Sequence, residues 1–268
     1  MILSLKDHVP EFLGKQRVET DLLGDYLPLG GASLISIGSR PGMGKTALAL
    51  TLALDFARKT GKSVYIFSYD MTAEQVCTRM LSILSGVSAS AIKEGNLSAE
   101  ELNKLEASYE TVRSLKVWVD DEMYVSRLEM EARLCEVEDL GMVIVDYLGM
   151  MVSPFSVSCE ETDENSAIIC MRSISRIFDV PVIFTHQLPR SVEGRKNKRP
   201  EIADLGRSIQ VAADTALLLY RESYYRDTGD EGGRAEILIV KNRYGGVGTL
   251  YSDWHGETMS FERLGEAK

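Results

Sequence analysis

The chain has 268 residues and a mass of 29.7 kDa, enough for one large α/β domain with a well-buried core and too little for two full-sized domains. Its net charge of −10 excludes nucleic-acid binding over the whole surface, so any such contact must be local. No apolar run approaches the roughly 20 residues of a membrane-spanning helix, and the four cysteines follow neither a zinc nor a disulfide pattern, which favours a soluble protein of the reducing cytoplasm.

Residues 1–29 are too few for a domain and are expected to form an N-terminal arm or linker that leads into one domain over residues 30–268. The first twelve residues mix charged with apolar side chains and lack the apolar core of a signal peptide. Farther on, short apolar runs alternate with longer amphipathic stretches. This alternation predicts βα units and a mostly parallel central sheet flanked by helices.

The predicted strands are Ser33–Ile37, Val64–Ser68, Val117–Asp120, Met142–Asp146, Val182–Thr185, Thr215–Tyr220, Ala235–Lys241 and Gly248–Tyr251. The predicted helices are Lys45–Lys59, Thr72–Ser85, Ala99–Ser114, Val125–Leu140 and Asn165–Phe178. Ser98 with Glu101 resembles a capping box at the start of the third helix. Because only glycine-rich turns separate the last strands, we expect the sheet to finish with antiparallel strands at its C-terminal end.

The most informative segment is Gly38–Thr46, which follows the first apolar strand and precedes an alanine- and leucine-rich helix. Such a loop directs backbone N–H groups at a polyphosphate, Lys45 neutralises the β- and γ-phosphates, and the Thr46 hydroxyl binds Mg²⁺. The first glycine falls one place early at Gly38, and Ser39 takes the position at which the usual pattern has glycine. The alternative is a glycine turn before an ordinary helix with a surface lysine.

Carboxylates end two further predicted strands. Asp146 follows an apolar run and is suited to orient Mg²⁺ or its bound water, while Asp70 follows Ile66–Tyr69 and is suited to polarise an attacking water. Each carboxylate also has a simpler explanation. Asp146 could be a helix cap or turn former, and Asp70 could cap the helix that begins near Thr72.

Two more strands end in polar or basic residues. Val182–Thr185 delivers His186 and Gln187 to the carboxyl edge of the sheet, where ligands bind in open α/β folds, and Gln187 is placed to sense a γ-phosphate. Lys241 and Arg243 end a late strand and cannot easily reach their own phosphate loop, so a neighbouring subunit's site is the alternative target. A structural histidine and a surface hairpin are the simpler explanations.

A basic cluster lies in the polar segment after Gln187. Its members are Arg190, Arg195, Lys196, Lys198 and Arg199. A charge run of this kind is usually a solvated loop, but this one lies where the surrounding motifs leave room for a functional loop.

Taken together, these residues resemble the C-terminal ATPase domain of the DnaB family of replicative DNA helicases, a RecA-like P-loop NTPase fold. The resemblance covers Gly30 to Phe261. It is carried by Ser39–Thr46, Phe67–Met71, Val145–Leu148, Gln187–Ser191, Lys198–Pro200 with Asp204 and Leu205, Tyr220–Arg221 and Lys241–Arg243.

The resemblance implies a ring of six subunits that bind ATP and Mg²⁺ between neighbours and grip single-stranded DNA in a central channel. The implied nucleotide-binding residues are Ser39, Arg40, Pro41, Gly42, Met43, Gly44, Lys45, Thr46 and Arg221, and the implied metal ligands are Thr46 and Asp146. The implied catalytic residues are Lys45, Asp70, the sensor Gln187, and Lys241 and Arg243 acting in trans. The implied DNA contacts are Arg190, Arg195, Lys196, Lys198, Arg199 and Arg207. Primase or a helicase loader is an implied partner, and no membrane contact is expected.

Several features depart from the family pattern. Asp70 replaces the usual glutamate and reaches less far toward an attacking water, the segment after Leu205 is about two residues shorter, and Ser158–Glu164 is acidic and would repel phosphates. The sequence shows no counterpart of the family's N-terminal domain, so we expect an excised domain or a free-standing relative. The alternative function is an ATP-switched assembly or adaptor protein that no longer translocates on DNA. A recombinase-like filament fits the fold but not these motifs.

Overall fold

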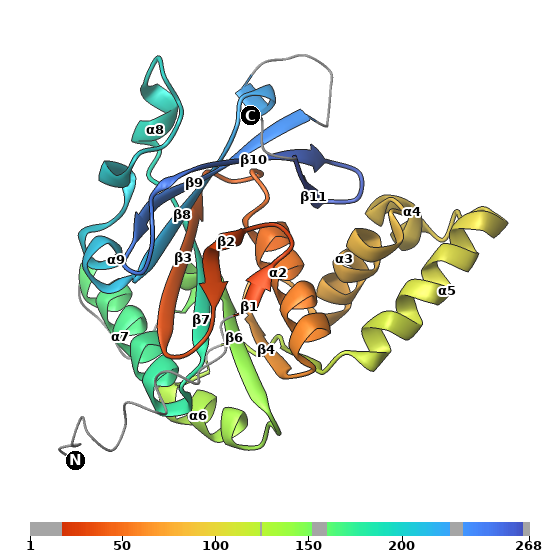
Figure 1. Cartoon of the computed structure of the whole chain (residues 1–268), viewed down its shortest axis with the longest axis horizontal. Coiled ribbons are helices and arrows are strands. Elements are labelled where there is room, and N and C mark those ends of the chain that lie inside the picture. Colours follow the sequence, from red (N-terminus) through yellow and green to blue (C-terminus); the bar gives the residue numbers. More distant parts are fainter. Residues whose placement is uncertain (1–17, 124, 152–159, 226–232, 265–268) are drawn as a thin grey trace.

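The computed structural model describes residues 18–123, 125–151, 160–225 and 233–264. Within these ranges, one sheet of nine strands has the order β11-β10-β9-β8-β3-β7-β6-β4-β5 (Figure 1). Its parallel strands are β3 (Ser33–Ser39), β4 (Ser63–Ser68), β5 (Val117–Asp120), β6 (Leu140–Asp146), β7 (Pro181–Gln187) and β8 (Thr215–Arg221). The antiparallel end consists of β9 (Gly233–Asn242), β10 (Gly248–His255) and β11 (Ser260–Arg263). The predicted mostly parallel sheet with antiparallel C-terminal strands is confirmed.

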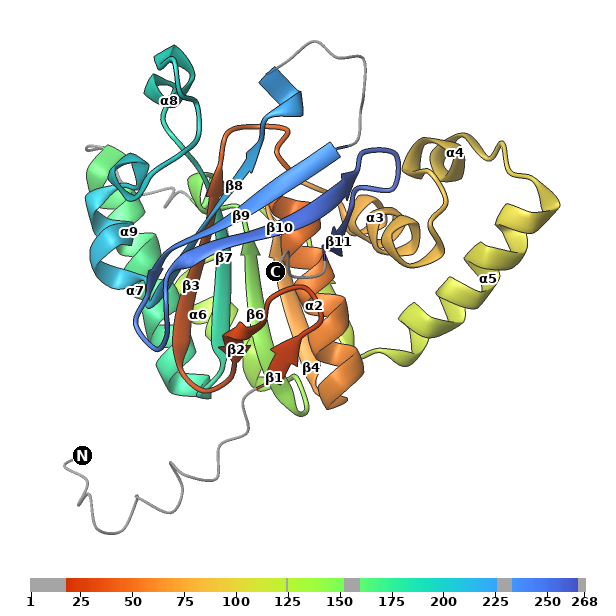
Figure 2. The same ribbon diagram turned by 45° about the horizontal axis from the view of Figure 1, so that its top comes forward.

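Helices cover both faces of the sheet (Figures 1 and 2). The helices of the described ranges are α2 (Lys45–Thr60), α3 (Ala73–Ser85), α4 (Ala89–Glu94), α5 (Ala99–Ser114), α6 (Arg127–Cys135), α7 (Glu160–Phe178), α8 (Ser191–Gly194) and α9 (Arg207–Ala212). Of these, α2 and α3 contribute to the core on one face of the sheet, and α6, α7 and α9 to the core on the other. Short 3₁₀ turns lie at Leu148–Met150, Ile202–Asp204 and Ser223–Tyr225.

The core consists of two hydrophobic clusters, one on each face of the sheet. Strand β6 sends Met142 and Ile144 into the cluster that contains α2, and Val143 and Val145 into the cluster that contains α7. Because successive side chains of a strand point to opposite faces, a strand buried on both sides reads as a continuous apolar run, as β6 does.

Helix α5 begins with the capping box expected at Ser98. The Ser98 hydroxyl accepts a hydrogen bond from the Glu101 backbone N–H, and the Glu101 carboxylate accepts one from the Ser98 backbone N–H. Thr72 with Gln75 and Ser126 with Glu129 form the same motif at the starts of α3 and α6. Thr72 is therefore the cap of α3 and not its first helical residue.

The largest difference from the sequence prediction is in residues 18–29, which were expected to belong to an arm. They form a hairpin of β1 (Val18–Thr20) and β2 (Gly24–Leu29) that packs on α2, as Figure 2 shows. Leu23 and Leu29 are fully buried there. The hairpin is thus part of the folded body, whereas residues 1–17 of the expected arm lie outside the described residues.

Smaller differences concern short elements. The helix expected over Val125–Leu140 is shorter, because the chain leaves the helix at Glu136 and turns into β6. Helix α4 and strand β11 were not predicted, since their six and four residues contain neither an apolar run nor an apolar period. No helix within the described ranges combines the length and the apolar character needed to cross a bilayer.

Candidate functional site

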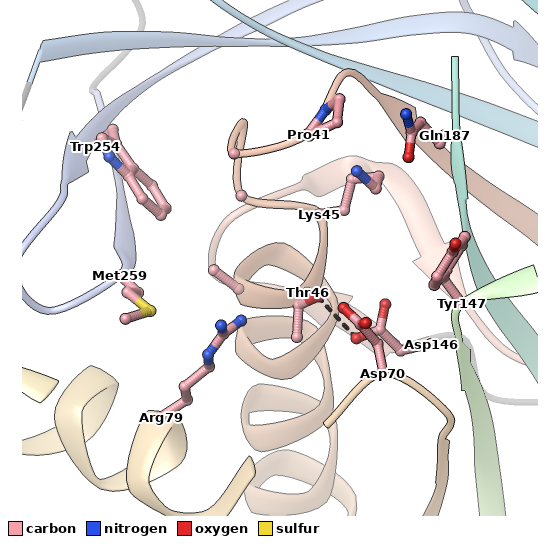
Figure 3. A pocket seen from close by; sticks show the side chains of 13 residues that line it. Pro41, Lys45, Thr46, Asp70, Arg79, Asp146, Tyr147, Gln187, Trp254 and Met259 are labelled. Carbon is pink, nitrogen blue, oxygen red and sulfur yellow. Dashed lines mark hydrogen bonds between the residues drawn. The ribbon is translucent and has the colours of Figure 1, made fainter. Parts of the chain in front are cut away.

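A cavity of about 370 Å³ opens at the carboxyl edge of the sheet, where β3 leads into α2 (Figure 3). The loop before α2, the ends of β4, β6 and β7, helix α3 and the β10–β11 turn all contribute to its wall. The lining residues are Pro41, Gly42, Gly44, Lys45, Thr46, Ala47, Asp70, Arg79, Asp146, Tyr147, Gln187, Trp254 and Met259.

The loop that begins the cavity depends on glycine at two positions. Gly42 has φ 74° and Gly44 has φ 103°, a backbone region that side chains disfavour. A Cβ on Gly44 would also lie 2.9 Å from both Trp254 and Phe261. Because Gly44 has no side chain to cap α2, the first N–H groups of that helix remain available to an anion.

Lys45 is the cation that the phosphate loop and the start of α2 contribute to this cavity. Its Nζ lies 3.4 Å from the Ser39 hydroxyl and 3.4 Å from the Arg40 carbonyl oxygen, both long for hydrogen bonds. Burial lowers the pKa of Lys45, and the nearby carboxylates of Asp146 and Asp70 oppose that shift. An ammonium that is partly desolvated and weakly held is well suited to bind phosphate oxygens.

Asp146 and Thr46 form the candidate metal site. The Thr46 hydroxyl donates a 2.7 Å hydrogen bond to Oδ2 of Asp146 (Figure 3). The Thr185 hydroxyl donates a 2.5 Å hydrogen bond to Oδ1 of the same carboxylate. Hydroxyl and carboxylate oxygens are the hard ligands that Mg²⁺ prefers, and Mg²⁺ usually completes its shell with substrate phosphates and water. The described residues contain no group of three His, Cys, Asp or Glu side chains that would hold a metal without such help.

Asp70 and Gln187 reach the same cavity from β4 and β7, the two strands that flank β6. The backbone N–H of Tyr69 donates a 2.7 Å hydrogen bond to the carbonyl oxygen of Asp146, which fixes the end of β4 beside the end of β6. Asp70 and Gln187 are exposed side chains in the cavity wall. The structure therefore brings Lys45, Thr46, Asp70, Asp146 and Gln187 together, as the sequence predicted.

Five residues of the wall were not predicted: Ala47, Arg79, Tyr147, Trp254 and Met259. Arg79 extends from α3 into the cavity, and burial lowers its pKa against the opposing charges of Asp146 and Asp70. Tyr147 directly follows Asp146 in the quoted motif, a signal that could have indicated it. Trp254 and Met259 come from the antiparallel end of the sheet, and no sequence pattern marks them.

Four predicted nucleotide-binding side chains do not line the cavity. Arg40 is buried and donates hydrogen bonds to the Leu188 carbonyl oxygen at 2.6 Å and to Glu193 at 3.0 Å. Ser39 and Met43 are also buried, and Met43 packs in the core. These side chains support the phosphate loop from the protein interior, on the side away from the cavity. The loop directs its backbone, and not its larger side chains, toward the cavity.

Arg221 is the fourth of these residues. Its Nη1 donates a 3.0 Å hydrogen bond to the carbonyl oxygen of Gly42, and its guanidinium lies 4.6 Å from the ring centroid of Trp254. The same guanidinium is 6.0 Å from the ring of Tyr224. Arg221 therefore joins the phosphate loop to the aromatic wall of the cavity, and its predicted direct contact with nucleotide is not seen in the lining.

Lys241 and Arg243 lie at the opposite edge of the sheet. Lys241 pairs with Ala216 and Asn242 with Thr215 at the start of β8, and Thr215 pairs with Ile35 near the start of β3. The phosphate loop follows the other end of β3, and a seven-residue strand spans about 20 Å. Neither cation can serve its own cavity in this arrangement, so their action on a neighbouring site stays a prediction.

The basic cluster after Gln187 divides into engaged and exposed members. Arg195 pairs with Asp204 at 2.7 Å, Arg199 pairs with Glu236 at 2.6 Å, and Lys198 lies over the ring of Tyr225 at 4.7 Å. The exposed members are Arg190 and Lys196, and Arg207, a predicted DNA contact outside the cluster at the start of α9, is exposed as well. Of the acidic segment, Ser158 and Cys159 lie outside the described residues, and Glu160–Glu164 form the beginning of α7.

Comparison with known proteins agrees with this arrangement. A sequence model of the family described as "DnaB-like helicase C terminal domain" matches residues 28–263. The chain belongs to this DnaB-like family. The DnaB-like chain is 37% identical over 237 residues to the replicative DNA helicase DnaC of Bacillus subtilis and 35% identical over 239 residues to the replicative DNA helicase DnaB of Geobacillus stearothermophilus. The alignments cover 86% and 87% of this chain but 52% and 53% of the two relatives, so the DnaB-like chain spans about half their length.

Solved structures give the same fold. One that is described as an ATPase domain superposes on the DnaB-like chain with a TM-score of 0.79 and 27% identity, covering 88% of this chain and 86% of that one. A DnaB-like replicative helicase, described with its interactions with primase, superposes with a TM-score of 0.82 and 23% identity, covering 97% of this chain and 65% of that one. The second likeness supports the RecA-like fold alone.

Proposed function

We propose that this chain is the motor domain of a DnaB-like DNA helicase, which hydrolyses ATP at subunit interfaces and uses it to translocate on single-stranded DNA. The observation that carries the proposal is the convergence of Lys45, the Thr46–Asp146 pair and Asp70 on one cavity at the start of α2. The family relationship supports the reaction class, since the relatives are named replicative DNA helicases.

The residues of the cavity fit MgATP by their chemistry. ATP supplies the γ-phosphoryl group that is transferred to water, and Mg²⁺ neutralises charge on its oxygens. The phosphate loop and Lys45 bind the polyphosphate, while Thr46 and Asp146 hold the metal. Asp70 orients the attacking water and accepts its proton, and Gln187 contacts the γ-phosphate. Trp254 offers an aromatic surface at the edge of the cavity.

Hydrolysis requires a neighbouring copy in this proposal. Arg243, with Lys241 beside it, stabilises the charge that develops on the γ-phosphate of the adjacent subunit, which is the usual role of an arginine supplied in trans. A head-to-tail ring of six subunits, as the family resemblance implies, gives each cavity one such arginine. Primase or a loader remains a proposed partner, supported by the DnaB-like helicase whose structure is described with primase.

Single-stranded DNA contacts the loop after β7 and the start of α9. Arg190, Lys196 and Arg207 are the leading candidates, since their side chains are exposed and could neutralise phosphates without first breaking an ion pair. Arg195, Lys198 and Arg199 shape the loop through the contacts described above and become DNA contacts only if those contacts open.

The decisive experiment is ATP turnover by the purified chain with and without single-stranded DNA. We expect DNA to stimulate turnover, and we expect Lys45→Ala to abolish it while Lys93→Ala, an exposed lysine on α4, leaves it unchanged. Turnover that requires Lys45 but ignores DNA would instead favour the ATP-switched assembly or adaptor protein. No turnover under any condition would contradict the motor function of the isolated chain.

A further inference from the structure

Asp214 is a fully buried carboxylate at the amino edge of the sheet, directly before β8. Its Oδ2 accepts hydrogen bonds from the backbone N–H of Leu34 at 2.9 Å and from Nη1 of Arg172 at 2.6 Å. Its Oδ1 accepts a 2.6 Å hydrogen bond from Nη1 of Arg243. A buried carboxylate with two guanidinium partners is fixed in place, because each partner and the strand backbone restrict a different direction.

Arg243 is held at both its backbone and its side chain. The Arg243 backbone N–H donates a 2.8 Å hydrogen bond to the carbonyl oxygen of Asp214, in addition to the bond from its guanidinium. The Arg243 side chain nevertheless remains 52% exposed. A guanidinium has five N–H donors, so one contact with Asp214 orients the group and leaves donors directed outward. Asp214 therefore orients the Arg243 guanidinium without burying it.

The same network includes the end of helix α9. Lys241 donates a 2.6 Å hydrogen bond to the carbonyl oxygen of Gln210, and Arg172 donates one to the carbonyl oxygen of Ala212. Helix α9 begins at Arg207, one of the candidate DNA contacts. Figure 2 shows the turn between β9 and β10 beside α7 and α9 and away from the start of α2. Asp214 therefore connects Arg243 with α9, the helix that begins at the candidate DNA contact Arg207.

We propose that Asp214 is a positioning residue, which holds Arg243 in the orientation that reaches the nucleotide bound by a neighbouring copy of this chain. This inference rests on the proposed trans role of Arg243. Asp214 acts through Arg243 and does not touch the nucleotide, because it lies at the other end of β3 from the phosphate loop. Its loss lowers the rate of hydrolysis at the neighbour's site and leaves nucleotide affinity at its own site unchanged.

The first test measures DNA-stimulated ATP turnover of the full chain for Asp214→Asn, Asp214→Glu, Arg243→Ala and the double variant Asp214→Asn with Arg243→Ala. Displacement of a catalytic group can lower a rate by up to about 10²-fold. We therefore expect both Asp214 variants to lower kcat at least about tenfold. The dissociation constant of a fluorescent ADP should change less than about twofold. The double variant is expected to match Arg243→Ala alone. Asp214→Glu retains the buried charge and thus gives a second measurement if Asp214→Asn folds poorly.

A purely structural role of Asp214 makes different predictions. The double variant would then be slower than Arg243→Ala, and Arg172→Met, which removes the other guanidinium partner, would lower kcat as much as Asp214→Asn does. We expect Arg172→Met to stay within about threefold of the wild-type rate, well inside the loss that misplacement causes. Equal losses in Arg172→Met and Asp214→Asn would overturn the proposal.

The second test identifies the subunit on which Asp214 acts. Chains with Lys45→Ala supply Arg243 but cannot turn over ATP, and chains with Arg243→Ala supply an intact cavity. Mixing the two should restore turnover, and adding Asp214→Asn to the Lys45→Ala chain should prevent that restoration, whereas adding it to the Arg243→Ala chain should not. If Arg243→Ala alone has no effect, the trans role fails. If restoration survives Asp214→Asn in the donor, only the role of Asp214 fails.

Discussion

The hydroxyl of Thr185 donates a 2.5 Å hydrogen bond to the carboxylate of Asp146, whose other oxygen accepts a 2.7 Å hydrogen bond from the hydroxyl of Thr46. Asp146 is only 4% exposed, so these two hydroxyls fix the plane of the carboxylate from both sides. The Thr46 oxygen keeps its lone pairs while its hydrogen is donated to Asp146, so it could bind a metal without releasing that carboxylate. Thr185, near the end of β7, orients the carboxylate through its other oxygen.

We therefore expect Thr185→Val, which removes the hydroxyl at nearly constant volume, to weaken metal binding about tenfold, the usual loss when a supporting hydrogen bond to a metal ligand is removed. The measurement is a titration of Mn²⁺ by electron paramagnetic resonance in the presence of ADP. Thr185→Ser retains the hydroxyl and should restore the affinity. Equal Mn²⁺ affinity in the valine variant and the wild type would show that Thr185 does not support Asp146.

Asp70 gives a prediction that separates chemistry from binding. Asp70→Asn removes the base while it retains the size of the side chain, so ATP turnover should fall about 10²-fold or more. The affinity for a fluorescent ADP should change little, because no water is activated in that complex. Asp70→Glu restores a carboxylate with one more methylene and is expected to remain active. A fully active Asp70→Asn variant would assign the base to another group.

Trp254 provides an optical report on the cavity. The sequence has two tryptophans, and Trp118 lies 54% exposed on β5, whereas Trp254 lines the cavity. In a Trp118→Phe variant, the remaining emission should change on addition of ADP with Mg²⁺, because the indole meets the nucleotide in place of water. In the matched Trp254→Phe variant, the emission of Trp118 should not respond. A response from Trp118 alone would place the nucleotide elsewhere.

His186 predicts a pH dependence of stability. The imidazole is 5% exposed and packs where a Cβ on Gly38 would lie only 2.5 Å away, and burial lowers the pKa of His186 to about 3. The folded chain therefore binds this proton less readily than the unfolded chain does. The stabilising contribution is present above the ordinary histidine pKa and is lost as the pH falls from about 6.5 toward 3.

The expected loss from this one histidine is about 1.4 kcal/mol of unfolding free energy between pH ~7.5 and ~5.5, measured by urea denaturation. Over the same interval, the unfolding free energy of His186→Asn should fall by about 1.4 kcal/mol less than that of the wild type. The other two histidines remain in both proteins, so their contributions cancel in the comparison. An identical slope in the variant would mean that His186 titrates normally in the folded state.

Much of the site could be predicted because parallel βα units place all strand ends at one edge of the sheet. Asp146 and Gln187 end strands, and Asp70 and Lys45 come shortly after strands, so these positions alone bring the four residues together. The confirmed antiparallel end likewise followed from short turns between apolar runs. These features depend on local patterns and on topology, which a single sequence reveals.

The features of the fold and of the site that were not predicted depend on tertiary packing. The direction of Arg40 is decided by Glu193, which lies 153 positions later, and Trp254 faces the cavity because of the register between β10 and β11. Arg195 and Arg199 read as exposed cations until their partners Asp204 and Glu236 are known. The hairpin over residues 18–29 was missed because its leucines show no clear period and acquire a core only against α2.

The cavity wall opposite the phosphate loop comes from β10 and from the turn that leads to β11, and these are the last two strands that the structure describes. During synthesis on the ribosome, the phosphate loop therefore emerges more than 200 residues before Trp254 and Phe261, which close against Gly44. A nascent chain carries its phosphate-binding loop long before that loop is supported. Competence to bind nucleotide is thus expected only after β10 and β11 have been synthesised, and a truncation within β11 should abolish it even though every motif of the proposed phosphate site is intact.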